Sequence, residues 1–310
     1  MKKIILNGLL AMLLLSLCAT FNSCDKDKDG IYNPKQKIKK VYLQEENSPK
    51  QLQQEWFWEK NKLTKVNQYY FDKIISSSTY SYEKNRLVKI SNGFAYTLIT
   101  YNGNKYKKME SFILESPLIS IDFIYNKDKI SKMLITVYDF FDLKKSENKF
   151  LSTIIPEEVI SKMFKSSKNK GNTKSSDPYV VTVTLKYDGD NIKETISEFE
   201  TIDGETRIKE KMVVTYTSYD KKNNPNYKNF IGDDFSSKNN PLEVNITSTT
   251  TYTESYFGEI TTETISLSSK ATYSYTYDKN DFPIEVRQTQ IEYDDDDVET
   301  NVVTTYYEYQ

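Results

Sequence analysis

The feature of this 310-residue chain that most constrains its fold is a short motif that recurs between residues 56 and 286. Its common form is an aromatic residue, any residue and a second aromatic residue, then Asp, Glu or Asn, then Lys or Gly, then Asn or Asp, and soon an apolar residue. The copies are WFWEKNKLTKV at 56–66, YSYEKNRLVKI at 80–90, FIYNKDKISKM at 123–133, LKYDGDNIKET at 185–195 and YTYDKNDFPIEV at 275–286, with looser copies at 99–109 and 217–227. A repeated motif predicts a repeated structural unit.

The chemistry of the motif is that of a β-hairpin. Residues at i and i+2 of a strand share one face, so Trp56 and Trp58 are expected to pack side by side. The Asp, Asn and Gly residues that follow favour a turn, because they tolerate left-handed backbone geometry. After the turn, Leu63 and Val66 stand three positions apart. This offset breaks strict alternation and predicts a β-bulge, or a residue that still belongs to the turn.

Composition agrees with a chain built from strands. The chain contains 25 Tyr and 15 Phe, yet only 37% of its residues are hydrophobic, which does not suit a thick, dry core. Tyr and Thr favour pleated surfaces, and a tyrosine ring can be half-buried while its hydroxyl stays in water. We therefore expect an all-β fold.

The copies resemble the YD-type (RHS-type) β-hairpin repeats of large bacterial surface and toxin-shell proteins. The resemblance covers most of residues 41–310 and implies a long, curved antiparallel sheet of repeated hairpins, largely single-layer or a half-barrel. The irregular spacing of the copies and the few glycines at their turns depart from the best YD repeats. These departures argue against a closed barrel.

We expect residues 41–310 to form one domain. Residues 141–178 and 221–241 are interpreted as internal loops, because both are long for a compact domain and contain polar stretches. In the first loop, Pro156 and the two acidic residues after it favour at most one short helix, near 156–164.

The stretch SCDKDKDG at 23–30 allows two interpretations. Its alternating aspartates followed by Gly30 resemble the start of an EF-hand calcium loop, which needs a bidentate Glu at position 12. Position 12 is Gln36 here, and Pro34 would interrupt the exiting helix. The calcium interpretation is therefore set aside.

In the second interpretation, Cys24 is a lipidation site. The apolar run over 4–18 is typical of a secretory signal and too short for a comfortable membrane span. Cys24, with Ser23 before it, resembles the acylated cysteine of a bacterial lipoprotein, although Phe21 stands where Leu is usual. The acidic run behind it resembles the surface-export tag of Bacteroidota lipoproteins.

The N-terminus and the repeats together resemble uncharacterised Bacteroidota surface lipoproteins. This resemblance implies a signal peptide over 1–23, a lipidated tether over 24–40, and attachment to the outer membrane through lipid on Cys24, with the domain facing the cell surface.

Composition also excludes several classes of function. The chain has no histidine, which excludes Ser-His-Asp and Cys-His catalysis and histidine-ligated zinc. Removing Lys2 and Lys3 with the signal leaves 40 basic and 44 acidic residues, a net charge of −4, which argues against nucleic acid or anionic lipid as a partner. No cofactor is indicated. Cys24 is the only cysteine of the mature chain, so no disulfide is expected.

Two candidate ligand sites remain. Trp56 and Trp58, with Tyr82 in the next copy, are candidates for an aromatic platform that stacks on sugar rings. The alternative is that the tryptophan pair packs on the buried face of the first hairpin. The acidic residues Asp294, Asp295, Asp296 and Asp297 are weak candidates for a hard-cation site, the alternative being a solvated turn.

Three functions are carried forward. The first is a non-catalytic, surface-displayed binding module for a glycan or a protein partner. The second is a structural or assembly protein of the outer membrane, which predicts unprotected edge strands. The third is a hydrolase based on two carboxylates, for which the spacing of the acids selects no pair.

Overall fold

The structure is a computed structural model, and it describes residues 36–138, 178–225, 227, 237–256, 259–294 and 297–310, except Phe94 and residues 204–205. Its strands are β1 (Ile38–Glu45), β2 (Gln51–Glu59), β3 (Lys62–Tyr70), β4 (Lys73–Glu83), β5 (Arg86–Asn92), β6 (Ala95–Asn102), β7 (Lys105–Ile113), β8 (Ser116–Asn126), β9 (Lys129–Val137), β10 (Tyr179–Asp188), β11 (Asn191–Asp203), β12 (Thr206–Tyr219), β13 (Pro241–Tyr256), β14 (Glu259–Tyr277), β15 (Pro283–Asp294) and β16 (Asp297–Tyr309).

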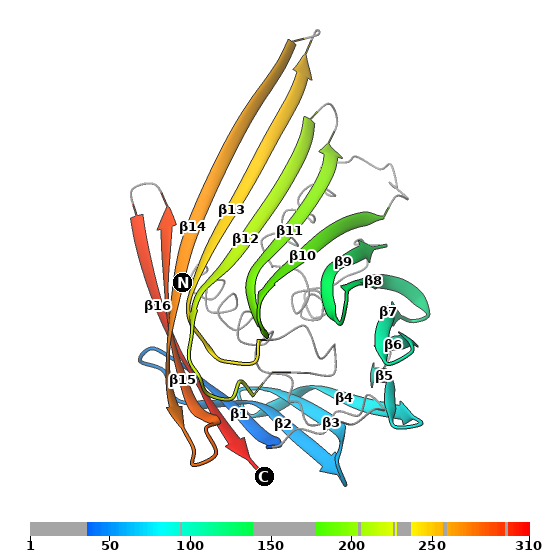
Figure 1. The fold of residues 1–310 in the computed structure, drawn as a ribbon, viewed down its shortest axis with the longest axis vertical. Helices are drawn as coiled ribbons and strands as arrows, with labels where there is room; N and C mark the ends of the chain where they lie inside the picture. Colours follow the sequence, from blue (N-terminus) through cyan, green and yellow to red (C-terminus); the bar gives the residue numbers. More distant parts are fainter. Residues whose placement is uncertain are drawn as a thin grey trace.

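These 16 strands form a closed antiparallel barrel in which each strand pairs with its neighbours along the chain (Figure 1). The first and last strands close it, with Val41 of β1 opposite Tyr307 of β16. The predicted open sheet or half-barrel is therefore wrong. The error has a physical cause: fifteen of the pairings join chain neighbours, whereas closure joins the two ends of the chain and leaves no local signal in the sequence.

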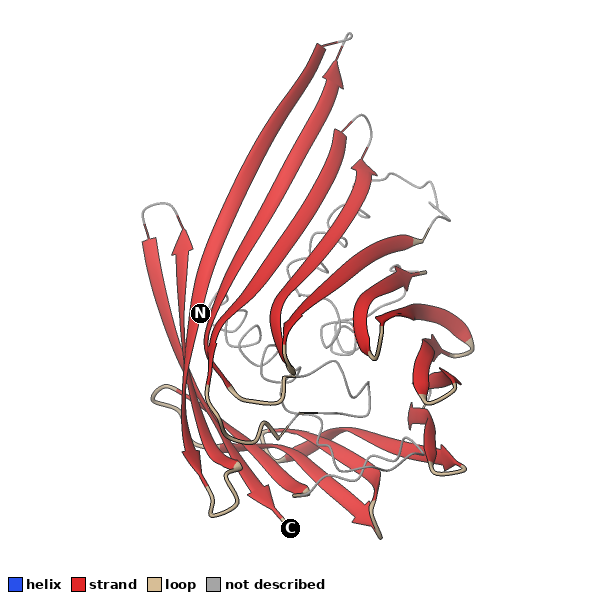
Figure 2. Cartoon of the chain, in the orientation of Figure 1, coloured by secondary structure: helices blue, strands red, loops and turns tan. Residues whose placement is uncertain are grey.

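The predicted helix near 156–164 and almost all of the predicted loop 141–178 lie outside the described residues. The described part of the chain consists of strands and the loops and turns between them (Figure 2). No helix within it is long and apolar enough to cross a membrane.

The wall of the barrel is uneven in height. Strands β13 and β14 contain 16 and 19 residues, against 7 in β5. At about 3.4 Å per residue, β14 is roughly 65 Å long and β5 roughly 25 Å. The long strands β11–β14 rise well beyond the others at one side (Figure 1). A closed barrel tolerates such unequal hairpins, so irregular spacing of the repeats does not argue against closure.

Apolar side chains line the inner face. Register places Trp56 opposite Val66, and Ile121 opposite Ile135, and all four are buried in one cluster. The cluster runs around much of the wall; its most buried members are Ile38, Leu63, Ile119, Ile130, Ile135, Val137 and Val181. Side chains from all strands converge only on the concave face of a barrel, so this face is the interior.

Within the described residues, six of the seven repeat copies contain the expected bulge. Phe57 pairs with Lys65 and Trp58 with Leu63, so Thr64 is the extra residue on β3. The same register shift occurs in the hairpins β4–β5, β6–β7, β8–β9, β10–β11 and β14–β15. The bulge lets Leu63 and Val66, three positions apart, share the inner face. The bulge prediction is confirmed.

The second aromatic residue of a repeat ties adjacent hairpins together. The Tyr82 hydroxyl donates to the Leu63 carbonyl at 2.9 Å, and the Tyr101 hydroxyl donates to the Leu87 carbonyl at 2.7 Å. Trp58 Nε1, Tyr219 and Tyr309 donate in the same way to the carbonyls of Ile38, Ile192 and Pro283. In the last copy the first aromatic residue, Tyr275, donates to the Pro241 carbonyl, and the second, Tyr277, donates to Asp220. We call this bond, from an aromatic residue to the preceding hairpin, the aromatic clasp.

A basic residue completes the clasp at several turns. Arg86 Nη2 donates to Asn104 Oδ1 of the next turn at 2.7 Å, and its guanidinium lies 5.5 Å from the ring centroid of Tyr101. Lys62, Lys105, Lys129 and Lys37 lie over Tyr82, Tyr125, Tyr187 and Trp58 in the same way. Cation–π attraction, in most cases together with a hydrogen bond, thus connects several turns of this rim to the next.

The barrel has two chemically different ends. We call the end with the motif turns, at residues 60–61, 84–85, 103–104, 127–128 and 189–190, the repeat rim. We call the end with the other hairpin tips, including 71–72 and 114–115, the far rim. Both chain ends of the barrel lie at the repeat rim, where Gln310 N donates to the Lys37 carbonyl at 2.9 Å.

Removal of one clasp hydroxyl is expected to destabilise the barrel. Tyr101→Phe leaves the Leu87 carbonyl without its donor and should lower the free energy of unfolding by about 1–2 kcal/mol. Tyr96→Phe, on the outer face against Phe112, is the matched control and should change it by less than about 0.5 kcal/mol. Urea unfolding measures both; equal effects of the two substitutions would contradict the role of the clasp.

Candidate functional site

The tryptophan pair lies inside the barrel. Trp56 is 2% exposed, and its ring stacks on Trp58 with centroids 6.2 Å apart. Trp56 Nε1 donates to Gln54 Oε1 at 3.0 Å, and Trp58 is half-buried in a clasp. An exposed platform at Trp56 is absent, and the burial agrees with the alternative of packing on the buried face.

Tyr82 likewise serves the architecture. It packs against the interior cluster, Lys62 lies 5.4 Å from its ring centroid, and its hydroxyl is bonded to a carbonyl. Burial raises the pKa of Tyr82, and burial raises the pKa of Tyr101 to about 12. The structure therefore brings Trp58 and Tyr82 to equivalent positions of successive repeats rather than to one ligand site.

The acidic cation candidates and the lipidation candidate lie only partly within the described residues. Asp294 and Asp297 end β15 and begin β16, opposite each other in register, while Asp295, Asp296 and Cys24 lie outside the described residues. Within the ranges that the structure describes, no group of three or more acidic or cysteine side chains could hold a metal ion.

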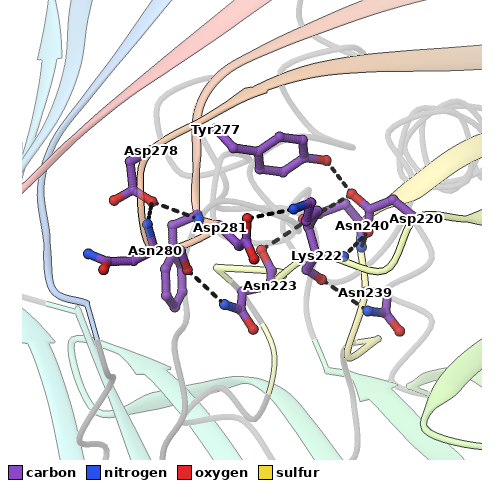
Figure 3. A network of polar contacts seen from close by, with 10 residues as sticks. Asp220, Lys222, Asn223, Asn239, Asn240, Tyr277, Asp278, Asn280 and Asp281 are labelled. Carbon is purple, nitrogen blue, oxygen red and sulfur yellow. Dashed lines mark hydrogen bonds and ion pairs between the residues drawn. The ribbon is translucent and has the colours of Figure 1, made fainter.

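A dense polar network holds the described part of the loop predicted at 221–241 against the turn at 278–282 (Figure 3). Asp220 Oδ1 accepts from the backbone N–H of Lys222 at 2.9 Å and of Asn240 at 3.0 Å. Asp220 Oδ2 accepts from Asn240 Nδ2 at 3.0 Å and from the Tyr277 hydroxyl. Both carboxylate oxygens of Asp220 accept hydrogen bonds from this chain, so the network holds the loop and the turn together at the repeat rim.

Exposed apolar side chains gather instead on the far rim. The β3–β4 tip presents Tyr70, Phe71, Ile74 and Ile75, and the β7–β8 tip presents Leu114. Phe71 is 61% exposed and Leu114 is 75% exposed. Four strand spacings separate β3 from β7, so the two tips lie roughly 20 Å apart along the wall. We call these five residues the tip cluster.

Two residues of the tip cluster, Phe71 and Leu114, are held in an unfavourable backbone conformation. Phe71 and Asp72 have φ of 45° and 60°, and Leu114 and Glu115 have φ of 46° and 69°. These values fit two-residue turns that favour Asn-Gly, and a bulky L-residue there costs roughly 1–2 kcal/mol. Two large apolar side chains are thus both exposed to water and kept at positions where glycine or asparagine is more stable.

Charged side chains occur on most strands of the outer wall. Register places Glu198 and Glu200 of β11 opposite Lys211 and Lys209 of β12 on this face, and Glu200 Oε1 lies 3.3 Å from Arg207 Nε. Other strands contribute Lys40, Glu55, Lys65, Lys89, Lys108, Asp122, Lys132, Lys186, Glu243, Lys270 and Arg287. A lipid-facing barrel carries an apolar outer band about 25 Å tall, in which a midplane Lys or Arg costs about 2–4 kcal/mol. The described outer wall shows no such band, because its apolar residues, such as Leu98, Ile124 and Val180, are interspersed with charged ones. The inner face is mostly apolar, although it also buries Glu210, Gln288 and Gln290.

No family model matches this chain, and no curated protein is similar to it. Among solved structures, a porin-like protein from Bacteroides uniformis ATCC 8492 has a similar fold, with a TM-score of 0.50 and 10% sequence identity. The alignment covers 88% of this chain and 96% of that chain. The likeness is one of fold, and it accords with the closed antiparallel β-barrel of this chain.

The tip cluster was missed from the sequence. Its signal is the presence of Tyr-Phe-Asp-Lys at 70–73 and Ile-Leu-Glu-Ser at 113–116 where a two-residue turn needs Asn-Gly. Recognising it requires knowing that these residues form turns at one end of a closed barrel.

Relief of the turn strain is expected to stabilise the protein. Phe71→Asn and Leu114→Asn place a residue that tolerates positive φ in each turn, so each should leave the melting temperature unchanged or raise it by a few degrees. Differential scanning calorimetry measures this. A fall of several degrees would show that the side chains support the fold.

The clasp tyrosines predict a loss of stability in alkali. Their folded pKa values are raised above the ordinary value near 10, so their contribution is complete below pH 10 and is lost as pH rises through the folded pKa. Denaturation midpoints should therefore fall between pH 10 and 12. Absorbance at the tyrosinate band should show the clasp tyrosines ionising only with unfolding; full ionisation of a folded barrel near pH 10 would contradict this.

Proposed function

We propose that the protein is a non-catalytic binding module, a water-exposed barrel held at the outer membrane by lipid on Cys24 and facing the cell surface. The observation that carries the proposal is the tip cluster, where Phe71 and Leu114 are exposed at strained turn positions. Such side chains weaken the isolated barrel and suit burial against a partner. The two tips provide separate anchors on one rim.

The outer wall supports a barrel beside the membrane rather than within it. Charged side chains occur on most strands around the described circumference, and ion pairs such as Lys270 Nζ to Glu243 Oε2 at 2.7 Å lie on the outer face. A bilayer would have to desolvate these groups, whereas water solvates them. A lipid on Cys24 supplies membrane attachment without a spanning wall.

The nature of the tips favours a protein ligand. Four of the five residues in the tip cluster are aliphatic or contain a purely hydrocarbon ring, and Tyr70 packs edge-on to Phe71 with centroids 4.5 Å apart. Apolar anchors of this kind fill pockets on partner proteins. Glycan capture by Trp56 and Trp58 stays a prediction, but burial of Trp56 removes the exposed face on which a sugar would stack.

The described barrel has no unprotected edge strand, which is the feature that the assembly alternative predicts. Strand β1 pairs with β16, and each described strand has two neighbours. Edge-to-edge addition of another chain would require a strand to leave the barrel.

Site-specific photocrosslinking tests the proposal. A photoreactive residue at position 71 or 114 of the full-length protein on cells should crosslink to the same protein, whereas one at Thr79 on the outer wall should not. Phe71→Asn combined with Leu114→Asn should reduce crosslinking from position 74 at least tenfold while the barrel stays folded. Testing the same variants on a glycan array distinguishes a protein ligand from a glycan ligand. Unchanged crosslinking in the double variant, or glycan binding lost with Trp58→Ala alone, would contradict the proposed site.

A further inference from the structure

The turns of the repeat rim also carry residues that the backbone disfavours. Lys60, Lys84 and Lys127 have φ of 56°, 46° and 56°, while Gly103 and Gly189 occupy the same turn position with φ of 62° and 55°. Glycine adopts this conformation freely and lysine does so at a cost in free energy. Three turns therefore keep a lysine at the apex although glycine serves at two others.

These apex lysines differ from the lysines of the clasps. Lys62, Lys105 and Lys129 lie over aromatic rings of the next repeat, whereas Lys60, Lys84 and Lys127 are exposed. None of the three apex side chains forms an ion pair with another residue of the described ranges. They project positive charge from the end of the barrel.

In this half of the wall, the turns of the repeat rim are therefore more basic than the tips of the far rim. The turns at 84–85 and 127–128 of the repeat rim have a lysine at the apex and a second basic residue, Arg86 or Lys129, two positions later. These basic residues outnumber the acids beside them, Glu83 and Asp128. The tips at 71–72 and 114–115 of the far rim have an acid in the turn, Asp72 and Glu115, and only the first is followed by a basic residue, Lys73. A net charge of −4 is an average over the whole chain and does not describe the repeat rim alone.

The chain enters the barrel at the same rim. Gln36 Nε2 donates to Asp278 Oδ2 at 2.6 Å, and Lys37 Nζ donates to the Lys60 carbonyl at 2.9 Å. Eleven residues separate Cys24 from Gln36. Even fully extended they span at most roughly 40 Å, so a lipid on Cys24 holds this rim within that distance of the membrane.

We propose that the repeat rim docks on the anionic, phosphate-bearing lipid headgroups of the anchoring membrane through Lys60, Lys84 and Lys127. The inference rests on the lipid anchor of the proposed function. Basic side chains near an anionic surface bind by charge attraction that weakens with salt. Docking of this rim turns the far rim and its tip cluster away from the membrane, toward a partner in the medium.

Vesicle flotation tests the docking surface without the anchor. The probe is the chain from Asp25 onward, which lacks the lipid and retains all 16 strands of the closed barrel. It should float with vesicles of phosphatidylcholine mixed with phosphatidylglycerol at low salt, and not with phosphatidylcholine alone. Lys60→Glu, Lys84→Glu and Lys127→Glu together should weaken this binding by roughly 100-fold or more, since each lysine contributes about 1 kcal/mol at an anionic surface.

Two further variants control the result. Lys65→Glu, Lys89→Glu and Lys132→Glu make the same charge change on the outer wall and should weaken binding much less. Lys60→Gly, Lys84→Gly and Lys127→Gly should weaken binding while the melting temperature stays constant or rises. Equal loss in the wall and rim variants, no binding to anionic vesicles, or equal binding to neutral vesicles overturns the proposal. Labelling of Cys24 with a radioactive fatty acid tests the anchor separately, and the tip variants test partner binding.

Discussion

The aromatic clasp is the interaction on which the rest of the barrel depends. In each case a ring from one repeat packs toward the interior while its polar atom donates to a carbonyl of the preceding hairpin, as Tyr82 does to Leu63 and Tyr101 to Leu87. The bond explains why the motif needs Tyr or Trp at its second aromatic position, since Phe has no donor. The basic residue after the turn adds a contact to the next ring, so the connection passes from turn to turn around the rim. A chain with few aliphatic residues can hold 16 strands in register because the rings provide both apolar area and polar bonds.

The two faces of the barrel differ in chemistry, and so do its two ends. The inner face is buried and mostly apolar, with a few buried polar side chains such as Gln288 and Gln290, and the outer wall carries charged residues and ion pairs. The repeat rim receives the N-terminal segment and displays apex lysines, while the far rim displays Phe71 and Leu114. At both rims the backbone is strained to keep a particular side chain at a turn. Strain retained for exposed side chains is better explained by contact with something outside the barrel than by the fold.

Sequence reasoning predicted the local structure well and the global structure poorly, for reasons visible in particular residues. The spacing of Leu63 and Val66 predicted the bulge at Thr64, because side-chain alternation is a local property. Closure was not predictable, because the pairing of β1 with β16 joins residues nearly 270 positions apart. The aromatic character of Trp56 suggested a platform, but only the concave face of a closed wall shows that it is buried. The tip cluster was missed because a turn with Phe71 at positive φ contradicts the sequence rules for turns.

Cysteine-accessibility labelling tests the central claim, that the outer wall faces water, most directly. The sequence has no cysteine after Cys24, so Thr79→Cys, Thr100→Cys, Thr247→Cys and Thr300→Cys each introduce one thiol on the outer wall, with Val66→Cys as the buried control. In native membranes, a membrane-impermeant maleimide should label all four wall positions rapidly and Val66→Cys slowly. Protection of a continuous belt of wall positions, at the level of the buried control, would show that the wall lies in lipid and would contradict the account.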